Sequence, residues 1–216
     1  MRAWAMAIGL LTSGCGLSTQ VRPTPKGVLV VEAAVGGPAA IVGGIPVPVP
    51  LSTVGVAWGF TQRSDLSTHL HLTTLIAQKI AGFDVGGSWL VLETKGARPA
   101  LTFGWRGYLF TDFESPALGF VDASLTASWN LSRRFVPFVS VTTQLSSLGL
   151  AVDVSPSVGV QIRFSRFSLQ AEVRYFAPNQ DARRAAVEWL SPYKHGAVGL
   201  VIGGRYALAD GLLADP

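Results

Sequence analysis

The stretch that decides the fold is residues 121–131, VDASLTASWNL, in which apolar and polar residues alternate strictly. The same alternation recurs over residues 152–164, VDVSPSVGVQIRF. Because successive side chains of a strand point to opposite faces, each segment has one apolar face and one polar face. A soluble β protein buries the apolar face, whereas a membrane barrel turns it to lipid and turns the polar face to its lumen.

The composition favours lipid as the solvent of the apolar face. Charged residues make up 14% of the 216-residue chain and hydrophobic residues 49%, against about 25% charged residues in average soluble proteins. After residue 15, no uninterrupted apolar run is long enough to form a spanning helix. Together with the alternation, this predicts an all-β, antiparallel up-and-down transmembrane β-barrel. The basic residues behind the net charge of +4 are scattered, so no nucleic-acid partner is expected.

The first residues have the pattern of a secretory signal: a positive start at Arg2, an apolar run over 3–11, and small residues after it. Residues 11–15, LTSGC, resemble the bacterial lipobox, although Thr12 stands where leucine is usual. The resemblance implies a signal peptide over 1–14, acylation of Cys15, and a lipidated tether over 15–26. With Gly16 after the cysteine, it also implies delivery to the outer membrane by the lipoprotein-sorting machinery. The alternative is an ordinary signal-peptide cysteine that is removed or left unmodified.

Cys15 is the only cysteine of the chain. An intramolecular disulfide and a cysteine-based zinc site are therefore excluded.

Residues 27–208 are expected to form the barrel and residues 209–216 a short tail. The barrel should have about ten strands, within a range of eight to twelve. The strands are expected at 27–35, 53–61, 66–75, 80–92, 100–110, 121–131, 135–144, 152–164, 167–176 and 197–208. Residues 36–52 are rich in glycine and proline and should be a loop or an edge excursion, because proline removes ladder donors. Gly86 and Gly87 suggest a bulge in the fourth strand.

Connection lengths and aromatic residues predict the orientation. The connections at 62–65, 132–134 and 165–166 are short, whereas those at 36–52, 145–151 and 177–195 lie at the opposite end and are longer. Short periplasmic turns and longer external loops are typical of outer-membrane barrels, so both termini are expected in the periplasm. Outward aromatic residues near the short turns form a candidate interfacial girdle: Trp58, Phe60, Trp129, Phe135, Phe164, Phe167 and Tyr206.

The last strand, with Gly203, Tyr206 and Leu208, resembles the carboxy-terminal signal by which outer-membrane barrels are recognised for insertion. The tail after it departs from the usual terminal aromatic residue. Over the whole mature chain, the organisation resembles small bacterial outer-membrane β-barrel proteins. This resemblance implies outer-membrane lipid and the barrel-insertion machinery as partners.

Acidic residues, basic residues and two histidines lie on the expected inner face. They are Glu32, His69, His71, Asp84, Arg106, Asp122, Asp153, Arg163, Glu172, Arg174 and Arg205. In the simplest hairpin register, Arg106 lies opposite Asp122 and His71 opposite Asp84, and such pairing lowers the cost of enclosing charge. A barrel of about eight strands is filled by side chains, and pores open at about 16 strands. We therefore interpret these residues as filling and neutralising the lumen of a structural or surface-interaction protein.

Three alternatives to this interpretation stay open. They are a narrow channel, an outer-membrane hydrolase that uses His71 and Asp84 as base and orienter, and a soluble lipocalin-like barrel. No nucleophile is marked beside His71, so enzyme function is the weaker hypothesis. His69 and His71 both face inward, but no third ligand is indicated, and neither a metal nor a cofactor is expected.

The longest loop carries an excess of basic residues, Arg183, Arg184 and Lys194. These side chains could bind the phosphates of lipopolysaccharide. The simpler interpretation is a solvated loop.

Overall fold

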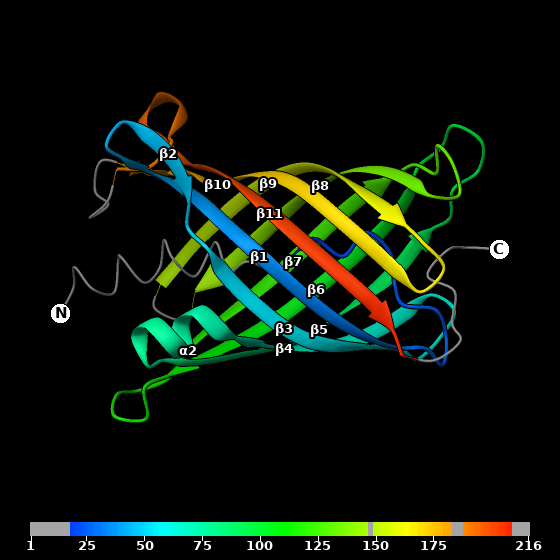
Figure 1. Ribbon diagram of the computed structural model, residues 1–216, viewed down its shortest axis with the longest axis horizontal. Coiled ribbons are helices and arrows are strands. Elements are labelled where there is room, and N and C mark those ends of the chain that lie inside the picture. The colour runs from blue at the N-terminus through cyan, green and yellow to red at the C-terminus, as the bar shows by residue number, and fades with distance from the viewer. Residues whose placement is uncertain (1–17, 147–148, 183–187, 209–216) are drawn as a thin grey trace.

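The chain forms a closed barrel of ten antiparallel strands, in which each strand pairs with its neighbour in the sequence and β1 pairs with β11 (Figure 1). The computed structural model describes residues 18–146, 149–182 and 188–208. The expected signal peptide, Cys15, the tail 209–216, and the loop residues Arg183 and Arg184 lie outside these ranges. The all-β, up-and-down architecture with about ten strands is confirmed.

The strands of the barrel are nine residues or longer, with the exception of β4. They are β1 (Leu29–Val42), β3 (Leu51–Gly59), β4 (Ser64–His71), β5 (Ala81–Leu92), β6 (Ala100–Thr111), β7 (Leu118–Ser128), β8 (Phe135–Ser146), β9 (Gly149–Arg163), β10 (Phe167–Asp181) and β11 (His195–Ala207). A short strand β2 (Ile45–Pro48), a helix α2 (Leu72–Gln78) and a 3-10 turn η2 (Pro192–Lys194) complete the elements. Most of the strands exceed the 9–11 residues that span a bilayer.

The two-residue alternation separates the two faces of the sheet. Leu125 is 52% exposed on the outside, whereas its neighbour Thr126 is fully buried. Outward residues such as Phe103 and Val141 flank Leu125 on β6 and β8. The outer surface is therefore a continuous apolar belt, and the buried side chains of the barrel are mainly polar.

The proline-rich residues 36–52 contain more strand than expected. β1 continues to Val42, and β2 folds back onto it with Val42 opposite Ile45. The prolines of β2 are tolerated because this strand lies at an edge of the sheet, next to β1. The excursion is thus an edge hairpin that projects from one end of the barrel (Figure 1).

The third expected strand, 66–75, is too long, because β4 ends at His71 and α2 begins at Leu72. Lys79 then ends the helix in a left-handed conformation, with its amide donating to the Thr74 carbonyl. The helix lengthens the connection to β5, so Asp84 pairs with His69 and not, as predicted, with His71.

The expected bulge at Gly86 and Gly87 is also misplaced, since the register shift in β5 lies between Leu90 and Leu92. Gly86 instead allows a close approach, because a Cβ atom there would lie 2.5 Å from the Trp105 carbonyl oxygen.

The two ends of the barrel differ. The connections β3–β4, β5–β6, β7–β8 and β9–β10 form what we call the tight-turn end, where β1 also begins and β11 ends. The edge hairpin, α2, the β6–β7 loop and the β10–β11 connection form the long-loop end (Figure 1). Six of the seven girdle aromatics are exposed at the tight-turn end, and Trp129 is half-buried. No described helix is long and apolar enough to cross a membrane.

Candidate functional site: the lumen and its mouth

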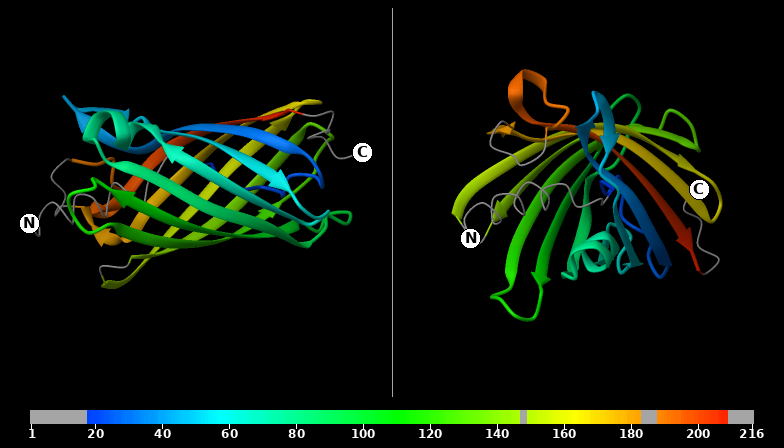
Figure 2. Two further views of the ribbon diagram at one scale, coloured as in Figure 1. Left: turned by 90° about the horizontal axis from the view of Figure 1, so that it is seen from below. Right: turned by 60° about the vertical axis from the view of Figure 1, so that its left-hand side comes forward.

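The first described residues, 18–26, run inside the ring of strands, and we call them the lumen segment (Figure 2). Its amino-terminal part lies halfway along the barrel. There, the Thr19 amide donates to Glu172 Oε2 at 3.3 Å, and Gln170 Nε2 donates to the Thr19 carbonyl at 2.9 Å. Its other end lies at the tight-turn end, where Lys26 forms an isolated bridge with Gly59. The expected periplasmic tether is thus, in its described part, a filling of the lumen.

An apolar contact supports the middle of the lumen segment. Val21 is buried against Val136 and Phe138, which face inward from β8. The Thr102 hydroxyl donates to the Val21 carbonyl at 3.0 Å. The segment is therefore held by both its backbone and its side chains.

Asp65 makes the densest set of contacts with the lumen segment. Its Oδ2 accepts from the Thr24 amide at 2.7 Å and from the Thr24 hydroxyl at 2.9 Å. Its Oδ1 accepts from the Ser88 amide at 3.0 Å and from the Ser88 hydroxyl at 2.7 Å. All three side chains are buried. A single carboxylate thus joins the segment to β4 and β5.

The inward charges form a network on β1, β4, β5, β6 and β11. His69 lies between two carboxylates, with Nε2 2.9 Å from Glu32 Oε2 and Nδ1 2.9 Å from Asp84 Oδ1. Arg106 Nη1 donates to Asp84 Oδ1 at 2.9 Å. Arg205 pairs with Glu32 at 2.6 Å.

Arg205 also connects this network to the lumen segment, because its Nη2 donates to the Thr24 hydroxyl at 2.6 Å. Opposite charges therefore meet directly in the lumen, as enclosure in a low-dielectric interior requires.

A second group of polar side chains lies on β6, β7 and β10. Arg174 pairs with Glu172 and donates to the Thr19 hydroxyl at 3.0 Å. Asp122 is opposite Arg106 on the backbone, as predicted, but its Oδ2 accepts from the Tyr108 hydroxyl at 2.6 Å. Arg106 binds Asp84 instead. Backbone register thus identified which residues face inward but not which charges pair.

The other predicted lumen residues also lie on the inner face. Arg163 is buried, with Nε donating to Gln161 Oε1 at 2.8 Å. Asp153 is half-buried opposite Gln144.

Little free volume remains beside the lumen segment. Two cavities that the segment lines hold about 10 Å³ and about 40 Å³. A cavity needs about 10–15 Å³ of such volume to hold one water. The smaller cavity is therefore at the limit for one water, and the larger has room for a few.

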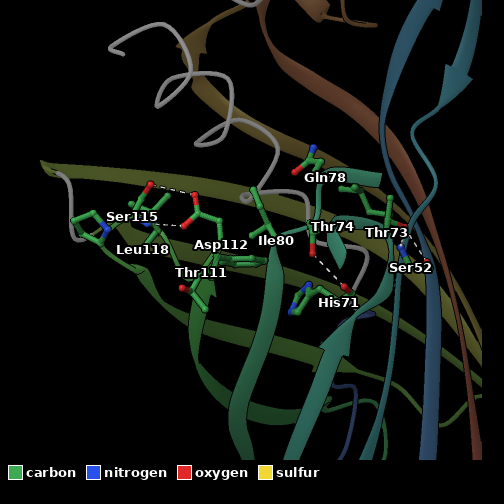
Figure 3. Close-up of a pocket in the computed structure, with 13 residues that line it drawn as sticks. Ser52, His71, Thr73, Thr74, Gln78, Ile80, Thr111, Asp112, Ser115 and Leu118 are labelled. Atoms are coloured by element: carbon green, nitrogen blue, oxygen red, sulfur yellow. Dashed lines mark hydrogen bonds between the residues drawn. The ribbon is translucent and has the colours of Figure 1, made fainter. Parts of the chain in front are cut away.

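A larger cavity of about 220 Å³ lies at the long-loop end, and we call it the mouth cavity (Figure 3). Its lining comes from the starts of β3 and β7, the ends of β4 and β6, α2 and the β6–β7 loop. The lining residues include Leu51, Ser52, His71, Thr73, Thr74, Gln78, Ile80, Phe110, Thr111, Asp112, Ser115, Pro116 and Leu118. Tyr108, Phe110 and Phe120 form an aromatic cluster there, and the His71 ring contacts Phe110 edge-on at 5.0 Å between centroids.

His71 and Asp84 meet despite the shifted register, with His71 Nε2 2.9 Å from Asp84 Oδ2. Within the described residues, the hydrogen bond of the His71 side chain goes to this carboxylate and not to a hydroxyl nucleophile. His69 and His71 both bind Asp84. In the same ranges, no three His, Cys, Asp or Glu side chains are grouped so as to hold a metal ion.

Asp65, Thr24 and Val21 belong to the candidate site, and the sequence did not indicate them. Asp65 looked like a turn residue, because the alternation of β4 becomes visible only from Leu66. The lumen segment has no alternation, and its prolines, Pro23 and Pro25, look like those of an exposed linker. No local signal distinguishes a linker in water from one inside a barrel.

Comparisons with known proteins identify no family. No family model and no curated protein matches the chain. Among solved structures, an outer membrane channel from Pseudomonas putida F1 is 8% identical, with 89% of this chain and 99% of that chain covered and a TM-score of 0.48. The translocator domain of autotransporter NalP from Neisseria meningitidis is 11% identical over 95% and 94%, with a TM-score of 0.42. Outer membrane protease OmpT from Escherichia coli is 10% identical over 88% and 100%, with a TM-score of 0.36.

Proposed function

We propose that the protein is a bacterial outer-membrane β-barrel whose lumen is closed by its own N-terminal segment, with a structural or surface-interaction role. The apolar belt supports a lipid environment, because soluble monomers rarely expose an apolar patch larger than a few hundred Å². The difference between the two ends supports an orientation with the tight turns in the periplasm. Both described ends of the barrel sequence, at β1 and β11, then face the periplasm.

The observation that carries the proposal is the bonding of residues 18–26 inside the lumen. Backbone groups of Thr19, Val21 and Thr24 are all paired with barrel side chains. The two cavities that the segment lines have room for one to a few waters. The segment thus occupies part of the space that a continuous aqueous path would need, which supports a closed lumen.

Conductance in planar bilayers tests the proposal. The full chain is expected to give no unitary conductance, and reproducible unitary steps would overturn the closed lumen. Val21→Asp places a carboxylate against Val136 and Phe138, so it should release the segment and produce openings. Leu131→Asp changes an exposed residue between β7 and β8 and should stay silent. Heat-modifiable gel mobility verifies that both variants are folded.

Acylation of Cys15, which the lipobox resemblance implies, competes with the closed lumen that we propose. Three residues span at most about 10 Å, and Ser18 lies inside the barrel next to Gly203. Residues 18–26 themselves occupy the lumen between Ser18 and the tight-turn end. An acyl chain on Cys15 therefore reaches the periplasmic leaflet only when the segment leaves the lumen. The closed lumen predicts that mass spectrometry and conductance on the same sample give an unacylated chain that does not conduct. An acylated chain that conducts would overturn the closed lumen, and an acylated chain that does not conduct would contradict the exclusion of one state by the other.

The surface interaction that we propose is binding of lipopolysaccharide phosphates by Arg183, Arg184 and Lys194. Support comes from Lys194, which is exposed at the long-loop end. Replacing all three with Ala should weaken binding to lipopolysaccharide vesicles severalfold and flatten its salt dependence. Arg133→Ala with Arg134→Ala removes exposed charges at the tight-turn end and serves as the control. Equal losses in both variants would overturn the assignment.

A further inference from the structure

The mouth cavity is large enough for a small ligand. Its volume of about 220 Å³ exceeds that of an apolar protein cavity of about 150 Å³ that binds benzene. In proportion, it has room for roughly nine non-hydrogen atoms. The mouth of a β-barrel is a common location for ligand sites.

Apart from the exposed side chain of Gln78, the walls of the cavity are apolar or carry an internal hydrogen bond. Leu51, Ile80, Phe110 and Leu118 supply hydrocarbon and aromatic surface, and Figure 3 shows Ile80 and Leu118 among the lining residues. Most of the polar lining is already engaged within the protein. The hydroxyls of Ser52 and Thr73 are 2.8 Å apart, and the Thr74 hydroxyl donates to the His71 carbonyl at 3.1 Å.

The acidic residue of the rim is engaged in the same way. Asp112 accepts from the Ser115 amide at 2.8 Å and from the Glu114 amide at 3.0 Å. Its carboxylate disfavours anions at the rim, and the nearest buried cation, Arg106, is already paired with Asp84.

His71 supplies one hydrogen-bonding atom for a ligand. A carboxylate accepts and does not donate, so the proton between Nε2 and Asp84 belongs to the imidazole. In the neutral ring, Nδ1 is then an acceptor. Among the described residues, Nδ1 of His71 has no hydrogen-bond partner. A hydroxyl group that enters the cavity can donate to it.

We propose that the mouth cavity binds a small uncharged molecule with a hydrocarbon body of one ring and one hydroxyl group, which donates to Nδ1 of His71. The ring packs against Phe110 and the aliphatic walls, and the hydroxyl group fixes its orientation. This site goes beyond the closed lumen of the proposed function and does not depend on it. Binding and conductance are measured separately, so either proposal can fail alone.

Binding of benzyl alcohol, toluene and benzoate to the folded full chain tests the site. Saturation-transfer NMR in detergent micelles reports each ligand. Benzyl alcohol is expected to bind at least fivefold more tightly than toluene, because toluene lacks the donor. Benzoate should show no saturable binding. Equal affinity for alcohol and toluene, or tighter binding of benzoate, would overturn the proposal.

Two variants locate the site. Phe at position 71 keeps an aromatic ring beside Phe110 but has no acceptor atom, and Asp84 retains its bonds to His69 and Arg106. His71→Phe should therefore abolish the preference for the alcohol and leave toluene binding largely unchanged. Ile80→Trp fills the cavity and should end the binding of both ligands. Phe83→Trp changes an outward residue of β5 and should have no effect.

Two results would contradict the proposed site. A preference for the alcohol that survives His71→Phe excludes Nδ1 as the acceptor. Saturable binding that survives Ile80→Trp places the ligand in the micelle or on the outer surface. If His71→Phe does not fold, the comparison of alcohol and toluene in the Ile80→Trp and Phe83→Trp variants still decides whether the cavity is the site.

Discussion

Removing the Asp65 carboxylate should destabilise the folded barrel more than breaking a water-exposed ion pair. Asp65→Ala leaves the amides of Thr24 and Ser88 buried without their acceptor. A buried donor without a partner costs about 1–3 kcal/mol, so two amides cost about 2–6 kcal/mol. The two hydroxyls can rotate toward other acceptors and add less. Thr24→Val loses both bonds of the hydroxyl, to Asp65 and from Arg205, but keeps the amide bond, so its expected cost is about 1–3 kcal/mol.

Urea unfolding in lipid vesicles, followed by the fluorescence of the six tryptophans, measures these losses. The midpoint should fall in the order wild type, Thr24→Val, Asp65→Ala at constant m value. Glu93→Ala is the matched control, because Glu93 forms an exposed ion pair with Arg63 and such pairs contribute about 0–1 kcal/mol. If Asp65→Ala costs no more than Glu93→Ala, the lumen segment is not bound as described.

Three further predictions concern the belt, the sheet and the loop. Leu125→Arg should lower the free energy of unfolding in vesicles by about 2–4 kcal/mol. The same change at a site exposed to water would lower it by no more than about 0.5 kcal/mol. Gly55→Ala places a Cβ atom 2.2 Å from the Thr68 carbonyl oxygen, so it should cost about 1–3 kcal/mol in the same assay. The amides of Ser115 and Glu114 donate to Asp112 and hold its pKa below the ordinary value. This stabilisation of the β6–β7 loop is complete above the ordinary aspartate pKa of about 3.9 and disappears as the pH falls through the lowered pKa. The amide chemical shift of Ser115 should follow that titration and lose it in Asp112→Ala.

The barrel could be predicted because its signal is local and repeated. Alternation identifies the faces of a strand without knowledge of its partners, so Leu125 and Thr126 were assigned correctly. Strand ends were less predictable where another element competes. The α2 helix replaces the end of a strand that alternation alone would extend to Leu75.

The lumen could be predicted only in part. Inward charges follow from alternation, but their partners depend on side-chain reach across several strands. Arg106 on β6 therefore binds Asp84 on the neighbouring strand β5, whereas the predicted partner, Asp122, lies on β7 on its other side. The contact between Thr24 and Asp65 joins residues 41 positions apart. No periodic sequence pattern predicts this contact, because the lumen segment is not a strand of the sheet.

Lipid contact at two neighbouring positions tests the central claim most directly. Leu125→Cys and Thr126→Cys, each in a chain that also carries Cys15→Ser, provide one thiol apiece for a fluorescent label. In vesicles of brominated lipid, the label at position 125 should be quenched strongly, and position 126 should resist both labelling and quenching. A water-accessible label at 125, or lipid quenching at 126, would contradict a barrel with an apolar outer belt and a closed polar lumen.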